Sequence, residues 1–121
     1  MSIFRLKLLM IFYQELSTLV ASGVNVVEAM EILSQHAGNP RLRKASGHIK
    51  EIVARGDSLN AALSQFPLLF PPWHINLIKY SEVSGTLSKG LQKIADYLEK
   101  DYDYQRKLIA GLAYPDRKSV V

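Results

Sequence analysis

The sequence predicts an all-α domain, a six-helix bundle with short loops in which the last helix is the longest. Glycine and proline interrupt the chain at short intervals, and apolar residues recur at helical spacing between these breaks. No segment shows the strict alternation of apolar and polar residues that is typical of a strand. With 121 residues, 48% of them hydrophobic and 21% charged, the chain can form one domain with a modest core.

The first two helices are predicted over residues 4–22 and 25–37. Gly23 follows the first helix, where helices often end on a left-handed residue and glycine adopts that conformation most easily. Asn25 and Glu28 have the spacing of a capping box at the start of the second helix. These signals place a short turn between the two helices.

The third helix is predicted to begin at Pro40 and to end before Gly56, and the fourth to run from Ser58 to Phe66. Proline suits the first helical position because its missing N–H would have no partner there. Gly47 lies inside the third helix, where glycine costs about 1 kcal/mol relative to alanine. We therefore expect a neighbouring helix to approach the third helix closely at Gly47.

The fifth helix is predicted between Pro72 and Gly85, and the sixth from its N-cap, Thr86, toward Pro115. The sixth helix continues a near-heptad apolar stripe. This stripe consists of Leu87, Leu91, Ile94, Leu98 and Tyr102.

The composition excludes several classes of function. The chain has no cysteine, which excludes disulfides and thiolate chemistry. No stretch approaches the roughly 18 consecutive apolar residues of a membrane span. His36, His48 and His74 are far apart, so we expect them at the surface or at helix ends without a zinc-binding pair. Phosphate loops and nucleophile elbows are also missing from the sequence, which predicts no enzyme and no catalytic, cofactor or metal site.

The acidic residues of the sixth helix allow two interpretations. Asp96, Glu99 and Asp103 fall on neighbouring turns, and oxygen ligands at such spacing can contribute to a Ca²⁺ site, particularly across a dimer. Alternatively, Asp96 pairs with Lys100 and Asp103 with Lys107, each i,i+4 pair contributing about 0.2–0.5 kcal/mol.

Glu82 is the carboxylate to which we assign a structural role. We expect it to hydrogen-bond to the loop at Gly85 and Thr86 and so to fix the angle between the fifth and sixth helices. The alternative is an exposed carboxylate in the last helical turn, where the helix dipole disfavours it.

The segment 80–87 resembles the Gly-Glu-x-x-Gly-x-Leu block of the F-type inner-membrane platform proteins of type II secretion and type IV pilus machines. Ser81 stands where that family usually has glycine. The resemblance covers residues 12–115. It also rests on the opening helix at 12–24, the second helix at 27–33, the Gly-x-Ser-Leu-x-x-Ala-Leu segment at 56–63, the Phe-Pro pairs at 66–67 and 70–71, and the Tyr-Pro at 114–115.

The resemblance implies a non-catalytic structural component that couples the cytoplasmic assembly ATPase to pilin or pseudopilin assembly. Residues 1–115 would form its first cytoplasmic domain at the bacterial inner membrane, with a missing membrane span to follow. Because residues 116–119 are polar where an apolar membrane helix should begin, we expect the chain to be a truncated fragment whose tail, residues 116–121, is foreign to the natural protein. The implied partners are the ATPase, other platform proteins and a second copy in a homodimer, with no nucleic acid and no small-molecule substrate.

Apolar groups are the main indication of a partner surface: core packing should account for most of them, and we expect the exposed remainder to serve a homodimer or partner contact through the sixth helix. The apolar groups cluster near the proline connector and on the sixth helix, and comprise Leu68, Leu69, Phe70, Trp73, Tyr97, Tyr102 and Tyr104. The structural or interface candidates are thus the sixth-helix stripe together with Glu82, Gly85 and Thr86.

A function of another class is suggested by the net charge of +4. In this alternative, a small basic helical domain binds nucleic acid through the third helix. The contacts would be Arg41, Arg43, Lys44 and Lys50. Such binding would weaken steeply with salt.

Overall fold

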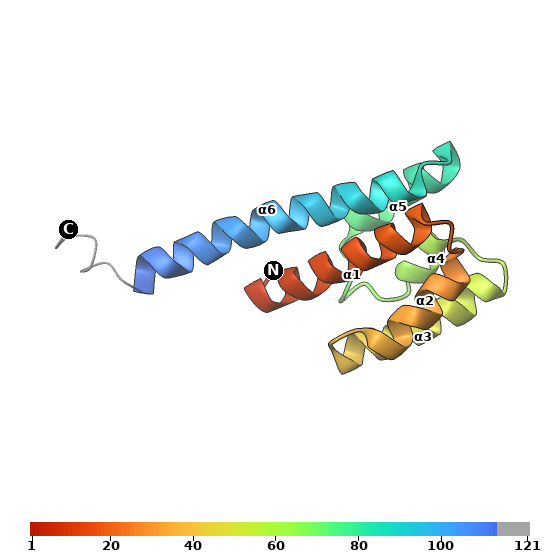
Figure 1. Cartoon of the computed structure of the whole chain (residues 1–121), viewed down its shortest axis with the longest axis horizontal. Coiled ribbons are helices and arrows are strands. Elements are labelled where there is room, and N and C mark those ends of the chain that lie inside the picture. Colours follow the sequence, from red (N-terminus) through yellow and green to blue (C-terminus); the bar gives the residue numbers. More distant parts are fainter. Residues whose placement is uncertain (114–121) are drawn as a thin grey trace.

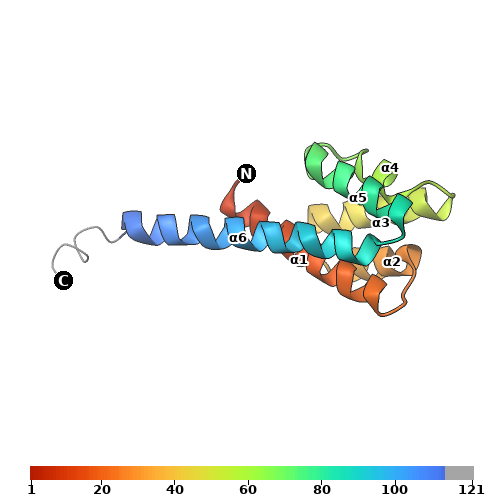
Figure 2. The same cartoon turned by 90° about the horizontal axis from the view of Figure 1, so that it is seen from above.

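The computed structural model describes residues 1–113, which form six α-helices and no strand, so the predicted all-α class is confirmed. The helices are α1 (Ile3–Ala21), α2 (Val26–His36), α3 (Pro40–Ala54), α4 (Leu59–Leu63), α5 (Pro72–Ser84) and α6 (Leu87–Ala113). α6 lies along α1, and α2 and α3 form a second pair on the other side of α1 (Figure 1). α5 contacts α6 and α4, and α4 contacts α3, so α4 and α5 connect the two pairs (Figure 2).

A single apolar core joins all six helices. It includes at least one buried side chain from each, for example Leu16, Met30, Ile49, Leu63, Ile78 and Leu91. The connector between α4 and α5 also contributes, because Phe70 is buried with its ring centroid 5.6 Å from that of Phe12. The Phe70 contact holds the connector against the bundle and decides where its exposed residues lie.

Side-chain caps begin three helices where the sequence predicted them. Asn25, Asn39 and Ser58 each accept a hydrogen bond from an amide of the first turn, at 2.9–3.2 Å. Thr86 is the exception. Its hydroxyl shares a 2.7 Å hydrogen bond with Ser84 Oγ and, in the part of the chain described, receives no bond from an amide of α6. The predicted side-chain cap at Thr86 is therefore wrong, although the position of the helix start is correct.

The ends of α4 and α5 show how local sequence stops a helix. Gly85 follows α5 with φ of 73°, the left-handed conformation expected of a terminating glycine. α4 ends at Leu63, three residues before its predicted end at Phe66. The chain tightens after Leu63, since Phe66 N–H donates to the Leu63 carbonyl three residues back. This tighter turn places Phe66 at the start of the connector.

The C-terminal part of α6 continues beyond the N-terminal end of α1 (Figures 1 and 2). Gln105 Nε2 donates to the carbonyl of Met1 at 3.5 Å, which marks the level at which α1 begins. Leu108 and Ile109, in the part beyond this level, are exposed. No helix within residues 1–113 has the length and apolar character needed to cross a membrane. The span expected after residue 115 and the tail of residues 116–121 lie outside the described residues.

Gly47 lacks the close contact that the sequence suggested. A Cβ added at Gly47 would meet nothing nearer than Ser34 Cβ of α2, at the ordinary van der Waals distance of 3.9 Å. We therefore expect Gly47→Ala to raise the free energy of unfolding by up to about 1 kcal/mol, because alanine loses less backbone entropy in a helix. Urea denaturation measures this change. A lower stability in the variant would contradict the spacing between α2 and α3.

Candidate functional site

The predicted apolar stripe of α6 faces the inside of the protein. Leu91, Ile94 and Leu98 are at most 2% exposed, and the half-buried Leu87 and Tyr102 pack against the edge of the core. These five residues hold α6 against the bundle within one chain. A partner contact through α6 would therefore use its outward residues, of which Tyr97, Tyr104, Leu108 and Ile109 are exposed.

Glu82 contacts a different helix from the one predicted. Its Oε2 accepts from Leu59 N–H at 2.9 Å, and its Oε1 accepts from Asn60 N–H at 2.9 Å and from Asn60 Nδ2 at 2.7 Å. The two backbone donors are first-turn amides of α4, which have no acceptor within their own helix. Among the described residues the Glu82 carboxylate makes no hydrogen bond to Gly85 or Thr86, although the Glu82 backbone carbonyl accepts from Gly85 N–H at 3.4 Å. The predicted contact of the carboxylate with that loop is therefore wrong. Glu82 instead connects the end of α5 to the start of α4.

The Glu82 contact compensates for the shortness of α4. A helix of five residues is not stable by itself, because one or two hydrogen bonds do not offset the cost of nucleation. Glu82 satisfies two amides of this helix, and the Ser58 hydroxyl satisfies a third. The negative charge also complements the positive end of the helix dipole. α4 therefore depends on a side chain that α5 supplies.

We expect Glu82→Ala to lower the free energy of unfolding by about 1–3 kcal/mol without abolishing the fold, because the first amides of α4 lose their charged acceptor. Glu82→Gln keeps one acceptor oxygen, so its free energy of unfolding should lie between those of the parent protein and Glu82→Ala. Thermal unfolding followed by circular dichroism measures the effect. Glu99→Ala removes an exposed carboxylate from α6 as the matched control. An unchanged melting temperature for Glu82→Ala would refute the capping role.

Ser81, beside Glu82, lies at a close approach of α5 and α6. It is buried, and its hydroxyl donates to the carbonyl of Leu77 at 2.8 Å. Gly90 of α6 lies opposite, so close that an added Cβ would lie 1.8 Å from Ser81 Oγ and 2.6 Å from Ser81 Cβ. Gly90 therefore marks the close helix contact that the sequence placed at Gly47.

His74 lies in the first turn of α5, one of the helix-end positions that the sequence allowed, but it is buried, whereas His36 and His48 are exposed. Its Nδ1 shares a 2.9 Å hydrogen bond with the hydroxyl of Tyr13 on α1, which is also buried. Burial, and to a smaller extent the positive charge of Arg5, lowers the pKa of His74 to about 4. Burial also raises the pKa of Tyr13 well above its usual value. Both groups are therefore neutral near pH 7, and the pair connects α1 to α5.

The pattern of α5 contained a signal for this burial. His74 lies four residues before Ile78 and seven before Ser81, and all three are buried. This i, i+4, i+7 spacing defines one helix face. A histidine that shares the face of an inward isoleucine could have been assigned to the core.

The carboxylates of α6 do not form the predicted ion pairs. Asp96 accepts a 2.8 Å hydrogen bond from Gln92, and Asp103 lies 3.9 Å from Arg106, so each contacts a residue other than the lysine four positions later. Among residues 1–113 there is no group of three or more histidine and acidic side chains placed to hold a metal ion.

The basic residues of α3 are divided between two faces. Arg43 Nη1 donates to the carbonyl of Ala37 at the end of α2, at 2.7 Å. Lys50 lies 2.6 Å from Glu31 of α2 and lowers the pKa of that carboxyl. These two contacts join α3 to α2 and remove both residues from the proposed nucleic-acid surface.

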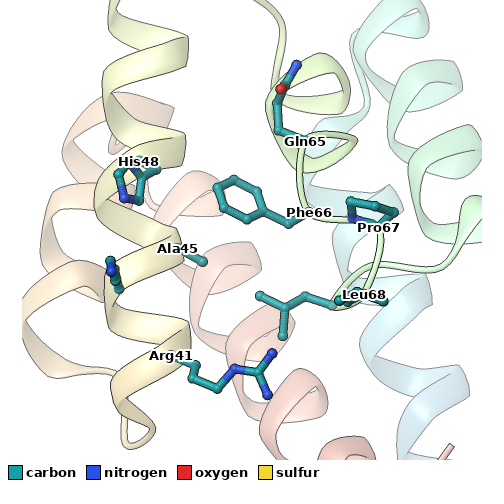
Figure 3. Close-up of a pocket in the computed structure, with 9 residues that line it drawn as sticks. Arg41, Ala45, His48, Gln65, Phe66, Pro67 and Leu68 are labelled. Carbon is teal, nitrogen blue, oxygen red and sulfur yellow. The ribbon is translucent and has the colours of Figure 1, made fainter.

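The other two basic residues of α3, Arg41 and Lys44, line a groove between α3 and the connector after α4. The groove has a volume of about 480 Å³. Ala45 and His48 of α3 and residues 65–69 of the connector complete its walls. Phe66 extends from the connector toward α3, and the guanidinium of Arg41 extends from α3 toward the connector near Leu68 (Figure 3). The groove is thus apolar on the connector side and basic on the α3 side.

The sequence did not predict this groove, although it indicated several of the residues that line it. Leu68 and Leu69 stood out as apolar residues of the connector, and Arg41 and Lys44 as basic residues of α3. The contribution of Phe66 depends on the early end of α4, which frees its side chain from the predicted helix.

Known proteins resemble this chain over most of its length. Residues 12–115 match the family model described as type II secretion system (T2SS), protein F. The type IV pilus assembly protein PilC of Thermus thermophilus is 37% identical over 92 residues, which are 76% of this chain and 23% of that protein. The type II secretion system protein F of Xanthomonas campestris pv. campestris is 33% identical over 104 residues, or 86% of this chain and 26% of that protein. The PilC protein of Pseudomonas aeruginosa is 30% identical over 105 residues, with shares of 87% and 28%. The chain spans about a quarter of the length of these relatives.

Proposed function

The chain belongs to the type II secretion system protein F family, and we propose that it is a structural part of the assembly platform for a secretion pseudopilus or a type IV pilus. The match over residues 12–115 supports this role, and the relatives are named for both machines. We place the longer protein in the bacterial inner membrane, with this domain on the cytoplasmic side. The domain carries out no bond chemistry in this proposal.

The extension of α6 beyond the bundle is the observation that carries this function. α6 is 27 residues long, and its first half is held in the core by Leu91, Ile94 and Leu98. A continuous α-helix is stiff, because every internal turn is closed by backbone hydrogen bonds. A displacement of the bundle would therefore move the far end of α6. In this way the domain would couple a cytoplasmic assembly ATPase to pilin or pseudopilin assembly.

A break in α6 tests this coupling in the full-length protein. Lys107 lies past the level at which α1 begins, so Lys107→Pro would interrupt the helix without disturbing the bundle. We expect the gene deletion and Lys107→Pro both to abolish fibre assembly or secretion, while the variant protein still accumulates. Lys107→Ala is the matched control and should restore assembly. Assembly that continues in the deletion strain would contradict the platform role, and assembly with Lys107→Pro would contradict the role of α6.

We also propose that the outward face of α6 meets a second copy of the protein. Tyr104, Leu108 and Ile109 form an exposed apolar set toward the C-terminal end of α6, and such sets favour protein contacts. Light scattering should detect a dimer that persists in salt, and Leu108→Glu should dissociate it. Tyr80→Glu, on the exposed side of α5, is the control. A monomer under all conditions would contradict this contact, and a dimer that requires Ca²⁺ would assign it to the carboxylates of α6.

A further inference from the structure

The groove beside α3 continues into a second groove, and together they form one trough. The second groove has a volume of about 490 Å³ and shares Arg41, Leu68 and Leu69 with the first. It continues past them to Phe4 and Arg5 at the start of α1. We call the two grooves the α3 trough. It extends from the middle of α3 across the connector to the N-terminal turns of α1.

The α3 trough carries positive charge without a compensating carboxylate. Arg5, Arg41 and Lys44 line it, and no aspartate or glutamate does so. In the described part of the chain, none of the three has a carboxylate within ion-pair distance. Positive charges that are grouped along a concave surface attract and orient an anionic partner. The charge of the trough therefore favours an anionic partner.

The apolar walls of the trough indicate that the partner is more than an anion. Phe4 is 78% exposed and Leu68 75% exposed, whereas Phe70, two residues after Leu68, is buried. Phe70 thus holds the connector in place while Leu68 lines the groove. Large side chains held in this way gain by contact with apolar groups of a partner. A small anion would leave Phe4 and Leu68 in water.

We propose that the α3 trough is the docking site for an acidic segment of a protein partner, in which apolar side chains lie between the carboxylates. Arg5, Arg41 and Lys44 pair with the carboxylates, and Phe4, Phe66 and Leu68 contact the apolar side chains. The identification of the partner as a component of the assembly machine rests on the proposed function. The chemistry of the trough is independent of it. Nucleic acid fits the trough less well, because Arg43 and Lys50 contact α2 instead of extending the basic surface.

Fluorescence anisotropy with labelled probes tests the docking site on the chain described above. The probes are a synthetic peptide of Glu, Leu and Ala, one of equal charge and length made of Glu, Ser and Ala, one of Lys, Leu and Ala, and a single-stranded oligothymidylate. We expect only the Glu, Leu and Ala peptide to bind with measurable affinity. The double substitution Arg41→Glu/Lys44→Glu should weaken its binding at least about tenfold. Leu68→Ser, at an exposed position that leaves the fold intact, should weaken it several-fold.

Controls separate the trough from the general charge of the protein. Lys93→Glu/Lys100→Glu makes the same change in net charge on exposed residues of α6 and should leave binding unchanged. Circular dichroism verifies that each variant is folded. The proposal is overturned if Arg41→Glu/Lys44→Glu binds as the parent does, if the Glu, Ser and Ala peptide binds equally well, or if the oligothymidylate binds more tightly. These results concern the trough alone, whereas the deletion strain tests the platform role, so either proposal can fail while the other stands.

Discussion

Gly90→Ala is expected to lower the free energy of unfolding by about 1–3 kcal/mol, the usual effect of overpacking in a core. The added methyl would lie 2.6 Å from Ser81 Cβ, a distance that side-chain rotation cannot relieve because Cβ is fixed by the backbone. α5 and α6 would have to move apart at this close contact. Leu91 and Ile94 are buried on the same stretch of α6, so the movement would also loosen the core.

A second substitution makes the prediction specific. Ser81→Gly removes both atoms that the new methyl would meet, and the remaining contact, with the carbonyl of Leu77, is at 3.8 Å. We therefore expect Ser81→Gly/Gly90→Ala to be more stable than the sum of the two single effects indicates. Urea denaturation of the four proteins in a double-mutant cycle measures this coupling. Simple additivity of the two changes would contradict the geometry at this helix contact.

Lowering the pH from about 6.5 to 4 is expected to reduce the free energy of unfolding by about 3 kcal/mol through His74 alone. Above pH 6.5 the imidazole is neutral in both the folded and the unfolded chain. Between pH 6.5 and 4 the unfolded chain takes up a proton at this histidine, whereas the folded chain does not, because burial and the charge of Arg5 lower the pKa of His74 to about 4. The contribution of His74 to stability is therefore complete above pH 6.5 and is lost as the pH falls toward 4.

The variant His74→Asn isolates this contribution. Asparagine has a polar group near the position of Nδ1 for the Tyr13 hydroxyl, and it does not titrate. We expect the variant to be less stable at pH 7 because of its smaller side chain, but to lose less stability than the parent between pH 6.5 and 4. Carboxylates titrate equally in both proteins, so the difference between the two pH profiles belongs to His74. His36→Asn, at an exposed position, should keep the parental profile. A parental profile in His74→Asn would refute the buried, neutral state.

The predictions that the structure confirmed concern single helices and their ends. Asn25 and Asn39 cap the helices that follow them, and Gly85 ends α5 in the left-handed conformation. The apolar stripe of α6 was recognised from its spacing, and the structure places Leu91 and Ile94 of that stripe in the core. Each of these signals acts over one or two helical turns, so neighbouring residues in the sequence are sufficient to recognise it.

Some local predictions failed, such as the Thr86 cap and the ion pairs of α6. The contacts that the sequence missed altogether join segments far apart in the chain. The hydrogen bond between Tyr13 and His74 joins residues separated by 61 positions, and Glu82 reaches Leu59 over 23. The partner of Gly90 is a residue of another helix. Periodicity indicates which face of a helix is buried, and it does not indicate which residue of another helix that face meets.

By itself, the sequence determined the helical class, most helix boundaries and the family resemblance, because these depend on local spacing, turn residues and motif order. The tertiary structure alone decided that Glu82 caps α4, that His74 is buried and that Gly90 marks the close helix contact. It also brought Arg41 of α3 and Leu68 of the connector to opposite walls of one trough. The physical reason is that the crossing of the helices sets which side chains meet, and this crossing results from the packing of the whole core.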